Sequence, residues 1–275
     1  MTSRSEQVVL TTGANSGIGL AAALEAARRG FRSVGGVRSE AKAAGLKQAA
    51  ADAGVEVETV QLDVADAAAC EEVIASLRPF GLVNNAGHPI SGAIEDVSDD
   101  AARAGLEAMV IAPMRLARLA IPHMREQGEG RIVNVSSIGG RTTLPLIGWY
   151  HAAKHALETL SDSLRVEVVG AGIKVVLVEP GSFKTGIWDQ HEREVDEQAG
   201  SRYARGYERT LTVTRLSEPI MGEPGRVGRV IAGALTSSRP RARYLVGYDA
   251  HALALLDQIT PTRVWDRATR MILDL

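Results

Sequence analysis

The chain of 275 residues is long enough for one large α/β domain, and its hydrophobic content of 45% provides for a sizeable core. Its net charge of −2 shows no bias toward nucleic acid, and no apolar run approaches the roughly 18 residues of a membrane span. The N-terminus has no apolar signal region, and the single cysteine, Cys70, excludes an internal disulfide and a multi-cysteine metal site. We therefore expect a cytoplasmic protein without a metal.

The first pattern in the chain is a strand, a glycine-rich turn and a helix. Residues 8–11 form a short apolar run, and an alanine-rich helix follows at residues 20–29. Between them the glycines are spaced Gly-x-x-x-Gly-x-Gly, which lets the backbone approach a pyrophosphate closely at the N-terminus of the helix. The turn is therefore a candidate dinucleotide site, with Gly13, Asn15, Ser16, Gly17, Ile18 and Gly19.

The second strand, residues 31–37, ends at Arg38. In nicotinamide sites this position reads the adenosine ribose, and an acidic residue there binds a free 2′-hydroxyl. No acidic residue ends this strand, whereas a guanidinium suits a 2′-phosphate and can stack on adenine. This favours NADP(H) over NAD(H), the alternative being a solvated arginine at the start of a helix.

Two further strand ends carry candidate cofactor residues. The strand at residues 55–62 ends in Asp63 and Val64, and the Asp63 carboxylate could accept the adenine amino group or cap the helix at residues 65–77. The strand at residues 80–83 ends in Asn84, followed by three more candidates, Asn85, Ala86 and Gly87. His88 comes next and could face a substrate or remain solvated.

The fifth strand, residues 131–136, leads into the stretch that organises the chain. Ser137 lies at its end, and Tyr150 and Lys154 lie in the first turns of the next helix, on one face because they are four residues apart. A cationic ammonium nearby favours the phenolate, so we expect Lys154 to lower the pKa of Tyr150. The pair then becomes an acid/base group for a carbonyl or alcohol oxygen, which Ser137 could also bind.

The last third of the chain begins with a strand at residues 173–178 and the loop that contains Pro180, Gly181 and Thr185. Residues 186–222 are charged, with aromatic residues interleaved, which indicates a mobile lid over an apolar pocket or, alternatively, a disordered insertion. A helix at 224–235 and a strand at 243–246 precede a helical tail at 249–275, whose apolar side could meet another subunit or flank the pocket.

Strands that alternate with helices predict one doubly wound parallel sheet of Rossmann type, with helices on both faces. In order and spacing, the motifs above strongly resemble the short-chain dehydrogenase/reductase family over roughly residues 5–250. The core would be residues 5–185 of a single domain, 1–275. The segment after Thr185 and the tail resemble the branch that includes retinol and hydroxysteroid dehydrogenases.

The resemblance implies a role for each candidate. Tyr150 would be the general acid in reduction, Lys154 would bind the nicotinamide ribose, and Ser137 would steady the reacting oxygen. Thr185 and the backbone at Pro180 and Gly181 would hold the carboxamide. The implied activity is hydride transfer from NADP(H) to a hydrophobic ketone, or the reverse from a secondary alcohol, by a homodimer or homotetramer. The alternative is a non-catalytic nicotinamide-binding sensor or interaction protein.

One position departs from the family pattern. A helix predicted at residues 98–125 carries Met109 where many members have an asparagine that completes a proton relay to the lysine, and a thioether cannot replace an amide. Pro113 has no N–H, so the Met109 carbonyl loses its helical partner. Either the enzyme is impaired, or this carbonyl holds the relay water by itself.

Overall fold

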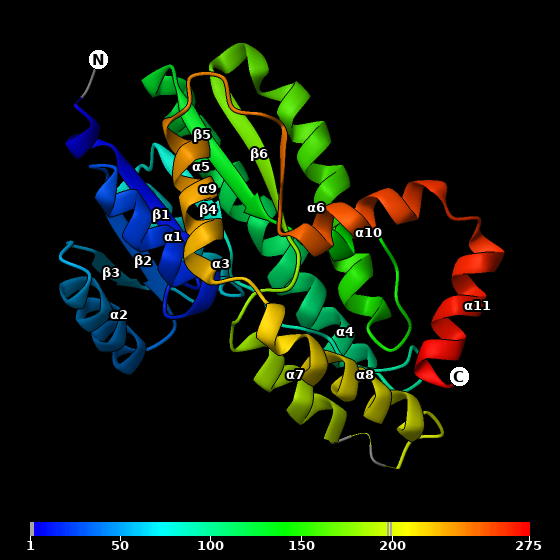
Figure 1. The fold of residues 1–275 in the computed structure, drawn as a ribbon. Helices are drawn as coiled ribbons and strands as arrows, with labels where there is room; N and C mark the ends of the chain where they lie inside the picture. Colours follow the sequence, from blue (N-terminus) through cyan, green and yellow to red (C-terminus); the bar gives the residue numbers. More distant parts are fainter. Residues whose placement is uncertain (1–2, 197, 199) are drawn as a thin grey trace.

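Seven parallel strands form the central sheet of the described chain, in the order β3-β2-β1-β4-β5-β6-β7 (Figure 1). The structure is a computed structural model that describes residues 3–196, 198 and 200–275. The strands are β1 Val8–Thr12, β2 Arg32–Val37, β3 Glu58–Gln61, β4 Gly81–Asn84, β5 Gly130–Val135, β6 Ile173–Pro180 and β7 Arg243–Val246. The strand order reverses between β1 and β4, which confirms the predicted doubly wound sheet.

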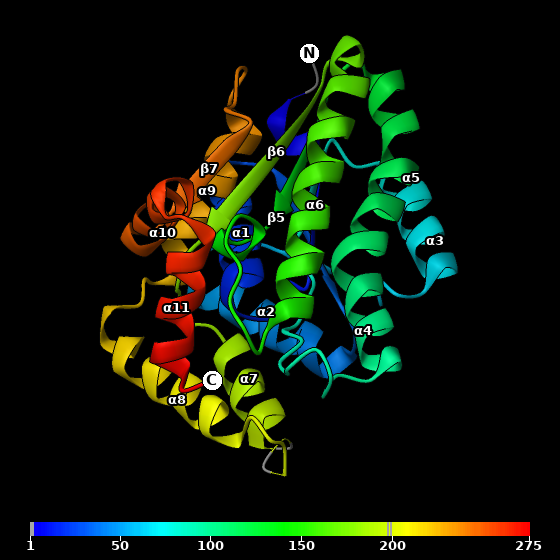
Figure 2. The same ribbon diagram turned by 90° about the vertical axis from the view of Figure 1, so that its right-hand side faces the viewer.

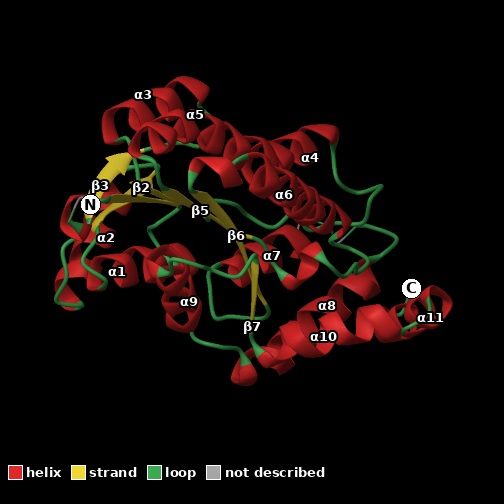
Figure 3. Cartoon of the chain, turned by 90° about the horizontal axis from the view of Figure 1, so that it is seen from above, coloured by secondary structure: helices red, strands yellow, loops and turns green. Residues whose placement is uncertain are grey.

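The inner strands are buried along their whole length, because helices cover both faces of the sheet. Neighbouring residues on a strand point to opposite faces, so Leu10 and Leu82 enter one core layer while Val9 and Val83 enter the other. Helices α3 (Ala67–Leu77), α5 (Ala112–Gln127) and α6 (Gly148–Glu167) lie on the first side, and α1 (Gly17–Arg28) and α9 (Pro224–Thr236) lie on the second (Figure 3). Helix α2 (Glu40–Asp52) connects β2 to β3.

The predicted helix at residues 98–125 is divided into three parts. Helix α4 (Asp99–Leu106) ends in a π-helical segment, Glu107–Ile111, and α5 begins at Ala112. The Ala112 N–H bonds to the carbonyl of Glu107, five residues back, and Pro113 stands in the first turn of α5. The discontinuity therefore lies just before the proline, where the ladder lacks the N–H that the proline cannot supply.

The segment at residues 186–222 is helical and lies across the carboxyl ends of the strands (Figure 1). It contains α7 (Ile187–Asp196) and α8 (Ala204–Ser217), so the alternative of a disordered insertion is wrong for the described residues. Residues 197 and 199 of this predicted lid lie outside the described residues.

The tail forms two helices, α10 (Tyr248–Ile259) and α11 (Thr262–Leu273), and α11 runs back beside α8 (Figure 2). Thr269 and Leu273 are buried, and the Trp265 indole N–H donates to the carbonyl of Thr143, in the loop before Tyr150. One side of the tail therefore flanks the candidate site. Within the described chain, no helix combines the length and apolar character that crossing a membrane requires.

Candidate active site

The glycine-rich turn folds as the sequence predicts. Gly13 and Gly17 have φ angles of +64° and +54°, a region that favours glycine. A Cβ on Gly19 would lie 2.3 Å from the Gly13 carbonyl oxygen, so that position has no room for a side chain. Ser16 precedes α1 without capping it through its side chain, which leaves N–H groups of the first turn available to an anion. The turn therefore fits a pyrophosphate.

The turn is clamped to the loop after β4. The Thr12 hydroxyl accepts hydrogen bonds of 3.0 Å from the backbone N–H groups of Asn85 and Ala86. The Asn85 side-chain amide donates to the carbonyls of Thr12, at 3.0 Å, and Gly13, at 3.3 Å. The candidates Gly13, Asn85 and Ala86 thus share one network with Thr12, in which Asn85 shapes the turn through its side chain.

Of the two side chains predicted for the adenosine end, Arg38 is free of hydrogen bonds and ion pairs among the described residues, whereas Asp63 already bonds to the backbone. Arg38 is exposed at the end of β2, and no ion pair or side-chain hydrogen bond involves it among the described residues, so its guanidinium is available. One oxygen of Asp63 accepts the Ala65 N–H at 3.0 Å, while Asp66 caps α3 through Ala68 and Ala69. The proposed cap at Asp63 is therefore wrong, because the helix begins three residues later than that alternative requires.

Val64 is held by its backbone. Its carbonyl accepts a 3.0 Å hydrogen bond from Arg115, and Arg115 also pairs with Glu107 at the start of the π-helical segment. This carbonyl is thus already bonded within the protein, and it connects the loop after β3 to the α4–α5 region.

Ser137, Tyr150 and Lys154 come together at the ends of β5 and α6. The Ser137 hydroxyl accepts the Gly139 N–H at 3.0 Å and starts a single 3-10 turn, Ile138–Gly140. Lys154 is buried and donates from Nζ to the carbonyl of Val135 at 2.9 Å. The same nitrogen lies 5.8 Å from the centroid of the Tyr150 ring. The predicted triad therefore forms one cluster.

The electrostatics of this cluster differ from the prediction. Burial raises the pKa of the Tyr150 phenol, and the Ser137 hydroxyl only partly opposes that effect. Burial also lowers the pKa of Lys154 to about 8, against the attraction of Glu158. The expectation that Lys154 lowers the pKa of Tyr150 is wrong for the site as the structure shows it, because loss of solvent dominates.

Met109 is buried, and its side chain packs toward the glycines on either side of it. A Cβ on Gly87 would lie 2.9 Å from Met109 Cγ, and a Cβ on Gly105 would lie 3.7 Å from Met109 Cε. The thioether thus fills the space between α4 and the loop after β4. The neighbouring Pro113 carbonyl accepts a 3.2 Å hydrogen bond from the buried Asn84 amide.

The loop after β6 completes the cofactor side. The Gly181 N–H donates to the Val246 carbonyl at 2.9 Å, which extends the pairing of β6 with β7 beyond Pro180. The Thr185 side chain lies against Gly17, with Cγ2 at 3.1 Å from where a glycine Cβ would stand. The loop predicted to hold the carboxamide therefore meets the turn predicted to bind the pyrophosphate.

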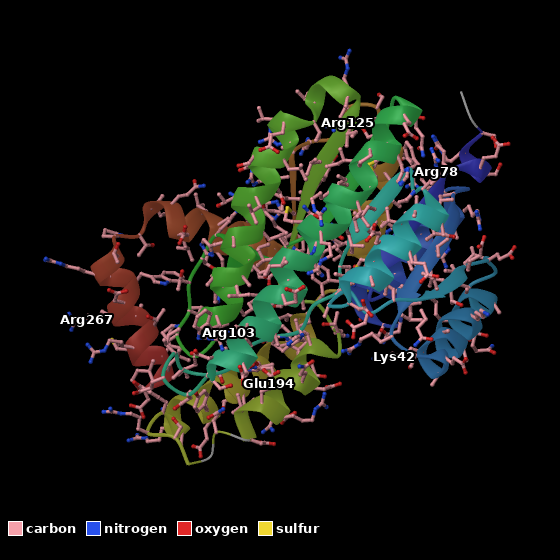
Figure 4. All side chains as sticks on the ribbon, turned by 180° about the vertical axis from the view of Figure 1, so that it is seen from behind. Lys42, Arg78, Arg103, Arg125, Glu194 and Arg267 are labelled. Carbon is pink, nitrogen blue, oxygen red and sulfur yellow. The ribbon has the colours of Figure 1, made fainter. Side chains whose placement is uncertain are left out.

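The predicted lid is tied to the loop after β4 by polar contacts that the sequence did not reveal. Ser91 Oγ lies 2.7 Å from His191 Nδ1, and the Ser91 N–H donates to Glu194 at 2.9 Å. The hydroxyl of Tyr207, on α8, accepts the Ala93 N–H at 2.6 Å. Figure 4 shows Glu194 where α7 meets the rest of the chain. His88 is half-buried in the same loop, and burial lowers its pKa.

A cavity of about 270 Å³ opens between the lid helices beside Thr185. Apolar side chains line part of it, among them Trp188, Leu211 and Met221. Charged side chains line the rest, so its walls are mixed where the sequence predicted an apolar pocket. The lining charged residues are Lys184, Asp189, Glu192, Arg215 and Glu218.

A doubly wound sheet, a turn that fits an anion near its switch point and a Ser–Tyr–Lys cluster at the same carboxyl edge are typical of a dinucleotide-dependent oxidoreductase. Comparisons with known proteins agree. The family model described as short chain dehydrogenase matches residues 7–196. The chain belongs to the short-chain dehydrogenase/reductase family, whose named relatives are oxidoreductases that act on CH–OH groups.

Three similar proteins place the chain further. It is 32% identical to the uncharacterized oxidoreductase YusZ of Bacillus subtilis, over 95% of this chain and 96% of that protein. It is also 32% identical to retinol dehydrogenase 16 of Mus musculus, over 95% and 87% respectively. The crystal structure of a variant actinorhodin polyketide ketoreductase with NADPH has a TM-score of 0.77 and 27% identity, and covers 92% of this chain and 99% of that one. The predicted resemblance to the retinol dehydrogenase branch is thereby confirmed.

Proposed function

We propose that this protein is an NADP(H)-dependent oxidoreductase that interconverts a hydrophobic ketone and the corresponding secondary alcohol. The observation that carries this proposal is the convergence of Ser137, Tyr150 and Lys154 at the same carboxyl edge of the sheet as the glycine turn. Polar groups gathered at this edge of a doubly wound sheet suit a reaction on a small molecule that lies across the switch point.

The nicotinamide, when bound, supplies or accepts the hydride. Tyr150 holds a proton on its phenolic oxygen at neutral pH, and burial raises its pKa further. The protonated phenol is the form that donates to a carbonyl oxygen during reduction. Ser137 provides a second hydroxyl for the same oxygen. Lys154 is anchored by one hydrogen bond to Val135, and an ammonium has three donors, so others remain for a ribose.

The preference for NADP(H) over NAD(H) rests on Arg38. Its exposed guanidinium lies at the end of β2, and this strand end has no carboxylate that could bind a free 2′-hydroxyl. A guanidinium matches a 2′-phosphate in charge and geometry. The similar ketoreductase was crystallised with NADPH, which supports the same choice.

The substrate proposal rests on the lid and on the branch of the family. The relative in Mus musculus is named for retinol, and the Trp188 and Leu211 side chains give the lid cavity an apolar part. We therefore expect a steroid-like or retinoid-like ketone or alcohol. A cytoplasmic location and a homodimer or homotetramer complete the proposal, by analogy with the family.

The decisive experiment follows NADPH oxidation with a panel of apolar ketones and compares wild type with Tyr150→Phe. Loss of a general acid lowers kcat by about 10²- to 10⁴-fold, while NADPH binding should persist. Tyr248→Phe is the matched control, because Tyr248 is 85% exposed at the start of α10 and should leave kcat unchanged.

Two outcomes would contradict the proposal. Turnover that survives Tyr150→Phe would refute the assigned proton donor. Tight NADPH binding by a wild-type protein that reduces no ketone in the panel and oxidises no alcohol would favour a nicotinamide-binding sensor.

A further inference from the structure

A buried cluster of charges lies behind the Tyr150–Lys154 face of α6. Its nearest member to Lys154 is Glu158, which follows one helical turn later and is 7% exposed. Glu158 Oε2 lies 3.1 Å from Arg243 Nε, and Arg243 Nη2 lies 2.5 Å from Asp162 Oδ2. The carboxylate beside Lys154 is therefore held by an arginine from β7.

The cluster continues to the turn that carries Ser137. Glu179, on β6, is fully buried and accepts two hydrogen bonds from Arg141, of 2.5 and 3.0 Å. The same carboxylate lies 3.1 Å from Arg243 Nε. Arg141 comes directly after the 3-10 turn that Ser137 begins, so the cluster joins this turn to α6, β6 and β7.

Gly140 shows how closely Glu158 packs against the catalytic turn. A Cβ at this position would lie 2.9 Å from Glu158 Cγ and 2.8 Å from Ser136 Oγ. Only a residue without a side chain allows the Glu158 carboxylate to enter the space behind Ser137. The site is thus shaped to hold this carboxylate.

The surroundings of Lys154 make Glu158 its important charged neighbour. From β5 it meets the neutral Val135 carbonyl. On α6 the neighbours are Tyr150 and Glu158, and Glu158 is the charge that opposes the effect of burial on Lys154.

Glu158 belongs to a group of charged side chains beside Lys154. Arg243, Glu179 and Asp162 face it from three elements, and Arg141 faces Glu179. Three carboxylates therefore share two guanidiniums inside the cluster, with Arg165 meeting Asp162 at the partly exposed edge. Burial raises the pKa of Glu158, and the hydrogen bond and charge of Arg243 work against that shift, so the arginine favours the charged carboxylate beside Lys154.

We propose that Glu158 is a positioning residue for the reaction at Tyr150. Its carboxylate, held by Arg243 and admitted by Gly140, keeps Lys154 a cation, so that the ammonium can orient a bound cofactor and the proton on the neighbouring phenol. This role rests on the proposed function. Burial has already lowered the pKa of Lys154 to about 8, so removal of the opposing charge brings loss of the ammonium into the physiological range.

A direct measurement follows the titration of Lys154 itself. The chain has five lysines, Lys42, Lys47, Lys154, Lys174 and Lys184, so ¹³Cε-lysine labelling gives few NMR signals, and Lys154→Arg assigns the one of interest. We expect Glu158→Gln to lower the titration midpoint of Lys154 by about one pH unit, the size of effect that one nearby charge produces. Glu158→Asp should restore part of the shift.

Asp162→Asn is the matched control. This substitution removes one negative charge and one contact with Arg243, as Glu158→Gln does. Asp162 lies two helical turns from Lys154, so the titration midpoint of Lys154 should stay within a few tenths of a pH unit of wild type. Equal midpoints in wild type, Glu158→Gln and Asp162→Asn would overturn the proposal and leave Glu158 a purely structural residue. If Glu158→Gln does not fold, Glu158→Asp decides, since an unchanged midpoint there has the same meaning.

The second readout is the pH profile of ketone reduction. Removal of a negative charge makes the Tyr150–Lys154 pair lose its first proton at lower pH, so the alkaline limb of kcat/KM should move down with the NMR midpoint in Glu158→Gln. The two readouts separate the two proposals. A protein without turnover fails the proposed function, yet its lysine titration still supports or overturns the role of Glu158.

Discussion

Gly19 is the position in the glycine-rich turn with the least space for a side chain. A methyl group there would lie 2.3 Å from the Gly13 carbonyl oxygen and 2.4 Å from the Asn85 amide nitrogen. Backbone cannot yield at such a distance, so Gly19→Ala should open the turn and raise the Kd for NADPH by at least about tenfold, a cost of about 1.4 kcal/mol. Fluorescence titration of NADPH measures this directly.

The control for this substitution is Gly45→Ala in α2. A Cβ there meets nothing within 4 Å, so alanine should stabilise the helix by about 0.5–1 kcal/mol and leave NADPH affinity unchanged. Equal affinities in Gly19→Ala and wild type would mean that the turn does not bind the pyrophosphate.

Arg38 provides the second test at this scale. Arg38→Gln removes the charge proposed to meet the 2′-phosphate, so the KM for NADPH should rise by about tenfold while the KM for NADH changes less than about twofold. Arg29→Gln is the control, because Arg29 is exposed at the far end of α1 and its loss changes net charge equally. A parallel loss for both cofactors would contradict the assignment to the 2′-phosphate.

At the scale of an element, the π-helical segment before Pro113 allows a test of the predicted relay through the Met109 carbonyl. Pro113→Ala supplies the N–H that an α-helix would offer to the Met109 carbonyl. If this carbonyl holds the relay water, the substitution should lower kcat several-fold without lowering the Tm. Steady-state kinetics and thermal melting of the same preparation test both expectations.

Met109→Ala is the companion variant. It leaves the carbonyl in place but removes the side chain that packs against Gly87, so it should lose about 2–5 kcal/mol of stability and retain most of kcat. The opposite pattern, with kcat kept in Pro113→Ala and lost in Met109→Ala, would exclude a relay through this carbonyl.

For the molecule as a whole, the parallel sheet and the order of its candidate residues could be predicted because both depend on local patterns. Apolar runs of strand length give the strands, and polar residues just after each run must reach the same edge of a parallel sheet. The ties of the lid could not be predicted, since Ser91 and His191 are one hundred residues apart and neither stands in a motif. The predicted direction of the Tyr150 pKa shift was wrong for a similar reason. Burial raises this pKa, and burial depends on the packing of segments that are distant in the sequence.

Buried neutral histidines make the stability of the whole molecule depend on pH. Burial lowers the pKa values of His151 and His191, whose Nδ1 atoms lie 2.8 Å from the Gly139 carbonyl and 2.7 Å from Ser91 Oγ. Below about pH 6.5 the unfolded chain takes up protons at these positions, whereas the folded chain takes them up only at lower pH. The free energy of unfolding should therefore fall with decreasing pH, by up to about 1.4 kcal/mol per pH unit for each histidine.

Urea unfolding at pH 7.5, 6.5 and 5.5 measures this slope. Glu58 and Asp162, whose pKa values are lowered by their arginine partners, lose their contribution only below about pH 4, so they do not interfere in this window. His191→Gln removes one titrating ring and should reduce the slope by about one proton. A stability that stays constant from pH 7.5 to 5.5 would show that both rings remain free to accept protons in the folded protein.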